Sequence, residues 1–149
     1  MTDSIDEGTA IVDTNIVIYA YDPEDARKHQ AAKSLLASLS GRGRLIFSAQ
    51  VFNEFSSLTM KPRRAHPLSP LEVVEILREL AAIAEVVSIT PAMTFLALDA
   101  MPRHGFSFWD ALIWAAAKEN GVATVYTEDF QHGRDVEGVR IVNPFLSTP

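Results

Sequence analysis

Short apolar runs alternate with longer amphipathic segments along the chain. Four of the apolar runs have the length of strands and carry their apolar residues consecutively, which is typical of parallel strands buried on both faces. A shorter run near the end of the chain adds a fifth. The expected strands cover residues 9–12, 44–48, 85–89, 122–127 and 139–143.

Between these runs the apolar residues recur at helical spacing, and capping residues or prolines mark where helices begin. Asp22-Pro23 predicts the start of a helix that runs to Leu39, and Ser69-Pro70 predicts the start of another. The expected buried stripe of that second helix consists of Leu71, Val74, Leu77, Leu80 and Ala81. The expected helices cover residues 16–21, 23–39, 50–60, 70–84, 91–101 and 108–120.

Strands that alternate with helices predict a parallel sheet with right-handed crossovers and helices on both faces. We therefore expect a single α/β domain over residues 1–149, with three layers (α/β/α) and a central parallel sheet of four to five strands. Residues 1–8 are acidic and polar, and we expect them to form a mobile leader.

Composition narrows the class of protein. The chain has 149 residues, 48% of them hydrophobic, and no cysteine, which excludes disulfides, thiolate metal sites and cysteine nucleophiles. No apolar run approaches the roughly 20 residues that cross a bilayer, and the N-terminus is unlike a secretory signal, so we expect a cytoplasmic protein. The net charge of −6 argues against a broad basic face, but it is compatible with a nuclease built on an acidic centre.

The first strand stops at Asp13, which is followed by Thr14 and Asn15. Ligands of open α/β sheets bind outside the carboxyl ends of the strands, so Asp13 is well placed for chemistry. All three residue types also cap helices, and a helix is expected directly after them. Capping therefore explains Asp13 as well as chemistry does.

Four further acids lie in or next to expected helices and strands. Glu54 lies at the edge of the apolar stripe of its helix, where an ionised carboxylate is costly unless it is paired or bound to metal, or swings out to solvent. Asp110 stands in the first turn of a nearly all-apolar helix, where it also forms a capping-box variant with Ser107. Glu128 and Asp129 follow the fourth strand directly.

These acids are expected at one edge of the sheet, because parallel strands all end on the same side. If the strands of Asp13 and Asp129 are neighbours where the strand order reverses, the acids converge with Glu54 and Asp110 in the ligand crevice. Carboxylates at such proximity repel one another or demand a cation. Mg²⁺ or Mn²⁺ suits oxygen ligands and can activate water and offset charge on a phosphodiester, so the chemistry implied is phosphodiester hydrolysis.

Five motifs carry a family resemblance: IVDTN at Asp13, NEF at Glu54, SFWDALI at Asp110, TEDFQHG at Asp129, and the final IVNPF. Together, over residues 11–145, they resemble PIN-domain ribonucleases and more narrowly the VapC-type toxins of bacterial toxin–antitoxin pairs. The resemblance implies a PIN-like fold and an Mg²⁺- or Mn²⁺-dependent endoribonuclease that cuts structured or single-stranded RNA, often tRNA or rRNA, and leaves 5′-phosphate and 3′-hydroxyl ends. It also implies a homodimer that is silenced by a cognate antitoxin, whose tail covers the acidic crevice.

Carried over to this sequence, the resemblance makes Asp13, Glu54 and Asp110 the principal acids and Asp129 the fourth. All four are expected to be catalytic and to bind metal, and the neighbouring Glu128 is a substitute for Asp129. The groups expected to surround them and to orient carboxylates or water are Thr14, Asn15, Thr127 and Glu128.

Basic residues that could contact RNA phosphates are few. The clearest cluster contains Lys61, Arg63 and Arg64, between two expected helices, and Arg42 and Arg44 form a weaker one. A solvated loop is an equally good explanation of the first cluster.

Three other functions remain open. A metal-free ribonuclease would need paired imidazoles, but the four histidines (His29, His66, His104 and His132) share no context. A phosphoaspartate phosphatase would use Asp13 as its nucleophile and usually carries a second Asp where this chain has Asn15. A catalytically silent PIN-fold module would only dimerise and hold a partner, and the intact acids speak against it.

Overall fold

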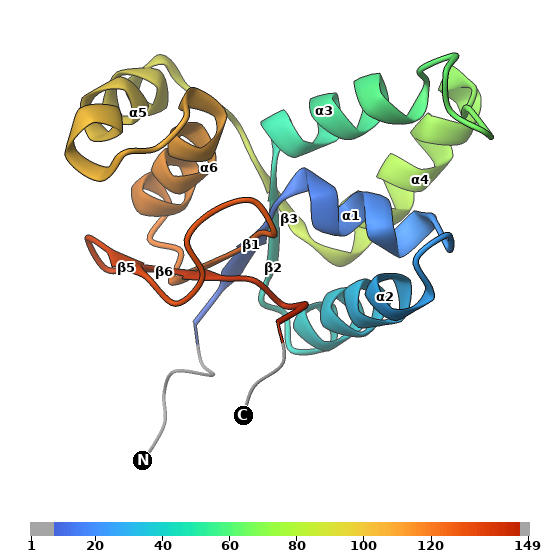
Figure 1. The fold of residues 1–149 in the computed structure, drawn as a ribbon, viewed down its shortest axis with the longest axis horizontal. Coiled ribbons are helices and arrows are strands. Elements are labelled where there is room, and N and C mark those ends of the chain that lie inside the picture. Colours follow the sequence, from blue (N-terminus) through green and yellow to red (C-terminus); the bar gives the residue numbers. More distant parts are fainter. Residues whose placement is uncertain (1–7, 147–149) are drawn as a thin grey trace.

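The computed structural model describes residues 8–146, so the leader expected over residues 1–8 lies outside the described residues except for Gly8. In chain order the elements are β1 (Ala10–Val12), α1 (Thr14–Tyr21), α2 (Ala26–Gly41), β2 (Leu45–Ser48), α3 (Ala49–Thr59), α4 (Pro70–Ile83), β3 (Glu85–Val87), α5 (Pro91–His104), α6 (Phe108–Glu119), β4 (Thr124–Tyr126), β5 (Asp135–Val136) and β6 (Val139–Val142). In Figure 1, α5 and α6 lie together on one side of the sheet and α1 to α4 on the other. The three-layer α/β architecture is confirmed.

The described strands form one six-stranded sheet in the order β3-β2-β1-β4-β6-β5. Five strands are parallel, and β5 pairs antiparallel with β6. The strand order reverses at β1, which has β2 on one side and β4 on the other. The two strands that lead into Asp13 and Asp129 are therefore neighbours at the reversal, where sheets of this type bind ligands.

The sixth strand, β5, was not predicted. It has only two residues, too few to show a hydrophobic pattern, and it is joined to β6 by a tight turn. Both turn residues have positive φ, 53° at Glu137 and 92° at Gly138, as the turns that match the twist of a hairpin require.

The core lies between the sheet and the helices. All residues of β1 and β2 are buried, and so are residues 111–117 of α6, as the sequence predicted. Trp114 at the centre of α6 is fully buried, and its indole N–H donates to the carbonyl oxygen of Val136 at 3.0 Å. Among the described helices, none combines the length and the apolar character that a membrane crossing needs.

Two helices begin elsewhere than predicted. α1 begins at Thr14, two residues early, because Asp13 caps it. α2 begins at Ala26 because Asp25, whose carboxylate accepts from the Lys28 N–H at 3.0 Å, is the cap. Asp22 instead closes a turn by accepting from the Glu24 N–H at 3.0 Å, so the proline between them precedes the helix.

The predicted stripe of α4 is wrong in part. Leu71 is 70% exposed and Val74 41% exposed, whereas Val73 and Leu80 are buried. Apolar residues occur nearly all round this helix, so spacing alone cannot select the face that meets the core.

α5 extends three residues beyond its predicted end, through Pro102 to His104. Proline removes one hydrogen bond, but in the last turn the helix can still close. Gly105 closes it in the left-handed conformation, with φ of 73°, by donating its N–H to the Met101 carbonyl oxygen at 2.8 Å.

Candidate active site

The register of two neighbouring strands places the first site residues. Val12 of β1 is paired with Tyr126 of β4. Past the strand ends, the Asp13 N–H donates to the Tyr126 carbonyl oxygen at 2.9 Å, and the Thr127 N–H donates to the Val142 carbonyl oxygen at 3.0 Å. Asp13 and Thr127 therefore lie side by side at the carboxyl edge of the sheet.

Asp13 is only 7% exposed, and both of its carboxylate oxygens accept hydrogen bonds. Its Oδ1 accepts from the Thr14 N–H at 2.7 Å, which caps α1, and its Oδ2 accepts from the Thr127 hydroxyl at 2.8 Å. The two explanations of Asp13 are thus compatible, because one oxygen caps the helix while the same carboxylate lines a cavity.

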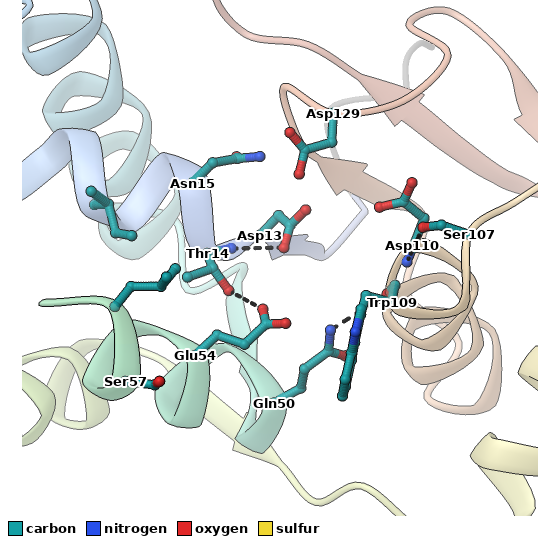
Figure 2. Close-up of a pocket in the computed structure, with 12 residues that line it drawn as sticks. Asp13, Thr14, Asn15, Gln50, Glu54, Ser57, Ser107, Trp109, Asp110 and Asp129 are labelled. Carbon is teal, nitrogen blue, oxygen red and sulfur yellow. Dashed lines mark hydrogen bonds between the residues drawn. The ribbon is translucent and has the colours of Figure 1, made fainter. Parts of the chain in front are cut away.

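Acids from four separate segments of the chain meet in this cavity, which has a volume of about 720 Å³. Asp13, Asp110 and Asp129 each place a carboxylate oxygen within 4.8 Å of the other two (Figure 2). Glu54 lines the same cavity from α3, but it is outside this group of three. Its carboxylate accepts a hydrogen bond from the Thr14 hydroxyl at 2.6 Å, so Thr14 ties Glu54 to the start of α1.

Ser107 caps the start of α6. The Ser107 hydroxyl oxygen accepts from the Asp110 N–H at 3.3 Å. This cap fixes the first turn of the helix at the cavity, and the Asp110 side chain points from that turn toward Asp13 and Asp129 (Figure 2).

The electrostatics of the cavity are one-sided. Among the described residues that line it, four are acidic and none is lysine, arginine or histidine. The pKa of Asp13 is raised to about 6, chiefly by burial and to a smaller extent by the charges of Asp129 and Glu54, despite the hydrogen bonds it accepts from Thr127 and Thr14. Burial, followed by the same two charges, also raises the pKa of Asp110.

Two of the expected surrounding groups connect the site to the loop after β4. The Thr127 hydroxyl, which donates to Asp13, also accepts from the Asp129 N–H at 3.1 Å. The Asn15 side-chain oxygen accepts from the Glu128 N–H at 3.4 Å. The Asn15 Nδ2 is buried without a hydrogen-bond partner in the described part of the chain, and the side chain points toward Asp129 (Figure 2).

Glu128 lies differently from Asp129. Its carboxylate accepts from the Tyr19 hydroxyl at 2.9 Å and forms an ion pair with Lys28. It is not among the residues that line the acidic cavity. The structure thus gives Glu128 a role in holding the loop after β4 against α1 and α2.

The basic residues singled out in the sequence lie outside the acidic cavity. Lys61 and Arg63 are exposed in the loop after α3, while Arg64 lies 3.6 Å from Asp22 and lines a neighbouring cavity. Arg42 lines a small cavity near the start of β4, at the opposite end of the sheet from the acids. Of the two basic clusters, only the first is near the acids.

Six residues that line the cavity were not predicted as site residues, among them Gln50 and Trp109. Gln50 lies one turn before Glu54 on α3, and Trp109 directly precedes Asp110. The i, i+4 spacing on α3 was the available signal for Gln50. Ser57, Ser107, Ile18 and Leu58 also line the cavity.

The donor set fits a hard divalent cation. Three carboxylates bring oxygen atoms into mutual reach, and the described part of the cavity offers no cationic side chain to balance them. Oxygen-only sites of this charge are typical of Mg²⁺ and Mn²⁺ and unlike the nitrogen and sulfur sites of zinc.

The fold and the site define an α/β protein with an acidic centre where the strand order reverses. The model of the PIN domain family matches residues 10–134, so this chain belongs to the PIN domain family. No curated protein matches the chain.

Several solved structures share the fold. VapC20 of Mycobacterium tuberculosis, described as a Sarcin-Ricin loop cleaving toxin, is 26% identical, with a TM-score of 0.65 over 81% of this chain and 90% of its own. A toxin–antitoxin complex from Klebsiella pneumoniae is 18% identical, with a TM-score of 0.67 over 91% of this chain and 98% of its own. VapBC2 of Rickettsia felis, bound to a DNA fragment from its promoter, is 17% identical, with a TM-score of 0.65 over 89% and 96%. At these last two identities the likeness concerns the fold.

Proposed function

We propose that this protein is a metal-dependent endoribonuclease that hydrolyses RNA phosphodiester bonds. The observation that carries the proposal is the meeting of Asp13, Asp110 and Asp129 in one cavity lined by no cationic side chain among the described residues. The carboxylates of such a cavity repel a phosphodiester unless a divalent cation is bound between them. Their oxygen atoms are suited to bind that cation.

In this proposal Asp13, Asp110 and Asp129 hold Mg²⁺ or Mn²⁺, with Glu54 beside them. When bound, the cation would lower the pKa of a bound water and offset negative charge on the phosphate. Thr14 contributes twice, because its N–H holds Asp13 and its hydroxyl holds Glu54. These contacts fix the carboxylates before substrate arrives.

Two other side chains complete the arrangement. The Thr127 hydroxyl fixes the second oxygen of Asp13 and, through the Asp129 N–H, the start of the loop that carries Asp129. The buried, unpartnered Nδ2 of Asn15 can donate a hydrogen bond to Asp129 or to a water beside it. In this proposal both residues orient the carboxylates or water, as expected from the sequence.

The rival enzymes have less support. None of the four histidines, all of which are described, lines the acidic cavity, so the pair of imidazoles needed for metal-free cleavage is not there. For a phosphoaspartate phosphatase, both oxygens of Asp13 already accept hydrogen bonds, and Asn15 stands where a second acid is usual.

We further propose that the protein is the toxin of a toxin–antitoxin pair, acts on tRNA or rRNA in the cytoplasm, and forms a homodimer. Two toxin–antitoxin assemblies share its fold, and VapC20 is described as cutting the Sarcin-Ricin loop. A cationic side chain of an antitoxin would be attracted into the acidic cavity. Exposed apolar side chains on α5, Phe95 at 71% and Leu98 at 50%, offer a surface for a second copy.

The function can be tested in cells. Brief induction of the wild-type chain should arrest growth and create new RNA ends, found by sequencing, that carry 5′-phosphates. Induction of the Asp13→Asn variant at the same level should do neither. New 5′-hydroxyl ends, or the same ends from both proteins, would contradict hydrolysis at this site.

The loop after α3 supports a prediction on RNA binding. The double substitution Arg63→Ala with Arg64→Ala should weaken binding of single-stranded RNA and lower the slope of log K against log salt by about 0.7 for each phosphate that is no longer neutralised. Fluorescence anisotropy of labelled RNA measures both. Arg42→Ala with Arg140→Ala removes the same charge at the other end of the sheet and should leave the slope unchanged. Equal slopes for all three proteins would mean that the loop does not contact RNA.

A further inference from the structure

Trp109 is an exposed aromatic residue beside the acidic cavity. It is 57% exposed although it stands in the first turn of a mostly buried helix, directly before Asp110. Its ring packs edge-to-face against Phe108, with centroids 5.1 Å apart and an interplanar angle of 71°. Figure 2 shows the indole next to Gln50 at the margin of the cavity.

A second cavity, of about 540 Å³, adjoins the acidic one. Trp109, Ile89 and Leu112 give it apolar walls, and Asn53 and Ser88 add hydrogen-bonding groups. It shares four lining residues with the acidic cavity: Gln50, Glu54, Ser57 and Trp109. A ligand group in the second cavity would therefore lie directly beside the carboxylates.

The floor shared by the two cavities contains an unsatisfied acceptor. Gln50 is 6% exposed, and its Nε2 donates to the Trp109 carbonyl oxygen at 3.4 Å. Its Oε1 is buried with no hydrogen-bond partner in the described part of the chain. Exchanging the two amide atoms would set two acceptors against each other, so the unsatisfied atom is the oxygen.

We propose that Trp109 and this second cavity form a subsite for one unpaired nucleobase of the RNA, next to the phosphate that is cleaved. This inference rests on the proposed ribonuclease function and names the part of the substrate that is recognised. A nucleobase combines a flat face, which stacks on an exposed indole, with an edge of polar groups. The polar groups on the edge of a base can form hydrogen bonds with Gln50, Asn53 and Ser88. An aliphatic side chain of a protein partner would leave these three residues without hydrogen bonds.

The subsite requires RNA that is single-stranded at the cut. A base in a duplex is already stacked and paired, so its face cannot meet Trp109 without being extruded. Within the structured or single-stranded RNA that the resemblance implies, the subsite selects a position with at least one unstacked base adjoining the scissile bond.

The chain contains its own optical reporter for this contact. It has two tryptophans, and Trp114 is fully buried. Stacking of a base should therefore quench the emission of Trp109 alone. The titration uses a mixed-sequence single-stranded RNA of about ten nucleotides, within the usual site size for single strands, in Mg²⁺. It is done in the Asp13→Asn background, where the RNA stays intact.

We expect saturable quenching that persists in Trp114→Phe and disappears in Trp109→Phe. Trp109→Ala should weaken binding of the same RNA about tenfold or more, measured by anisotropy, and Trp109→Phe should restore part of it. The duplex of the same sequence should not quench. Trp109 is exposed, so its Phe and Ala variants are expected to keep the fold.

Several results would overturn the inference. They are the absence of RNA binding, binding without quenching, equal affinity of wild-type and Trp109→Ala proteins, or an emission shift on raising the protein concentration without RNA. The last would assign Trp109 to a contact between proteins. Absence of RNA cleavage by the wild-type chain in Mg²⁺ would refute the proposed ribonuclease, while the quenching still decides whether a base binds at Trp109.

Discussion

Asp13→Asn should abolish RNA cleavage and at the same time stabilise the metal-free fold. Asparagine keeps the shape of the side chain but removes the charge at the centre of the acidic cavity. Loss of a group that acts in the transition state typically costs about 10²–10³-fold in rate, and here we expect about 10³-fold or more because the same carboxylate would also hold the cation. The rate of cleavage of a labelled RNA in MgCl₂ measures this effect.

The effect on stability follows from the raised pKa of Asp13. Its folded-state pKa of about 6 lies above the value of 3.8 for the free side chain, so the ionised carboxylate opposes folding. This penalty is fully present above pH 6 and disappears as pH falls from 6 to below 4. By the free-energy equivalent of the shift it amounts to about 3 kcal/mol.

In EDTA, the Asn variant should therefore have the larger free energy of unfolding at about pH 7.5, and the difference should vanish near pH 4. Urea unfolding at several pH values measures it. Glu119→Gln, at the exposed far end of α6, removes the same charge and should change neither activity nor stability appreciably. An Asn variant that is active, or that is less stable than wild type in EDTA above neutral pH, would contradict the role and environment inferred for Asp13.

Removal of divalent metal should stop cleavage, and adding it back should restore both cleavage and stability. Binding to the folded state at a free metal concentration of about 100 times Kd contributes about 2.7 kcal/mol. For a chain of 149 residues that corresponds to a rise in Tm of roughly 8 °C. Thermal unfolding in EDTA, and then in MgCl₂ or MnCl₂, measures the rise.

The metal effect has to be separated from screening, because any salt weakens repulsion among the acids. KCl at the same ionic strength is the control and should raise Tm much less. The double variant Asp13→Asn with Asp110→Asn should lose the specific part of the rise. Cleavage that survives EDTA would point to metal-free chemistry, and an equal rise in the double variant would place the metal elsewhere.

Elements with strong local signals were predicted well. Ser69 and Glu72 form a capping box, and α4 begins at Pro70, as predicted. The apolar run of residues 111–117 is buried throughout, because a helix without a polar face must be covered. The start of α2 was misplaced because Asp22 and Asp25 are equally good caps by composition, and only the turn between them selects the second.

Among the site residues, too, some were recognisable from the sequence and others only from the structure. Asp13 stood out because a buried strand stops at a carboxylate. Trp109 did not stand out, since an aromatic residue in an apolar helix normally belongs to the core, yet it is 57% exposed. Glu128 and Asp129 are chemically alike neighbours, and only the fold sends one to Lys28 and the other into the cavity.

The sequence by itself determined the alternation of strands and helices, the parallel sheet and the acids at the ends of its elements, because these follow from local patterns and short-range chemistry. The tertiary structure decided which of those acids meet. Their proximity depends on β1 pairing with β4, and on the hydrogen bonds of Thr14 and Thr127 that aim Asp13 and Glu54. Pairing between segments more than a hundred residues apart is a property of global packing, and it leaves no mark on either segment alone.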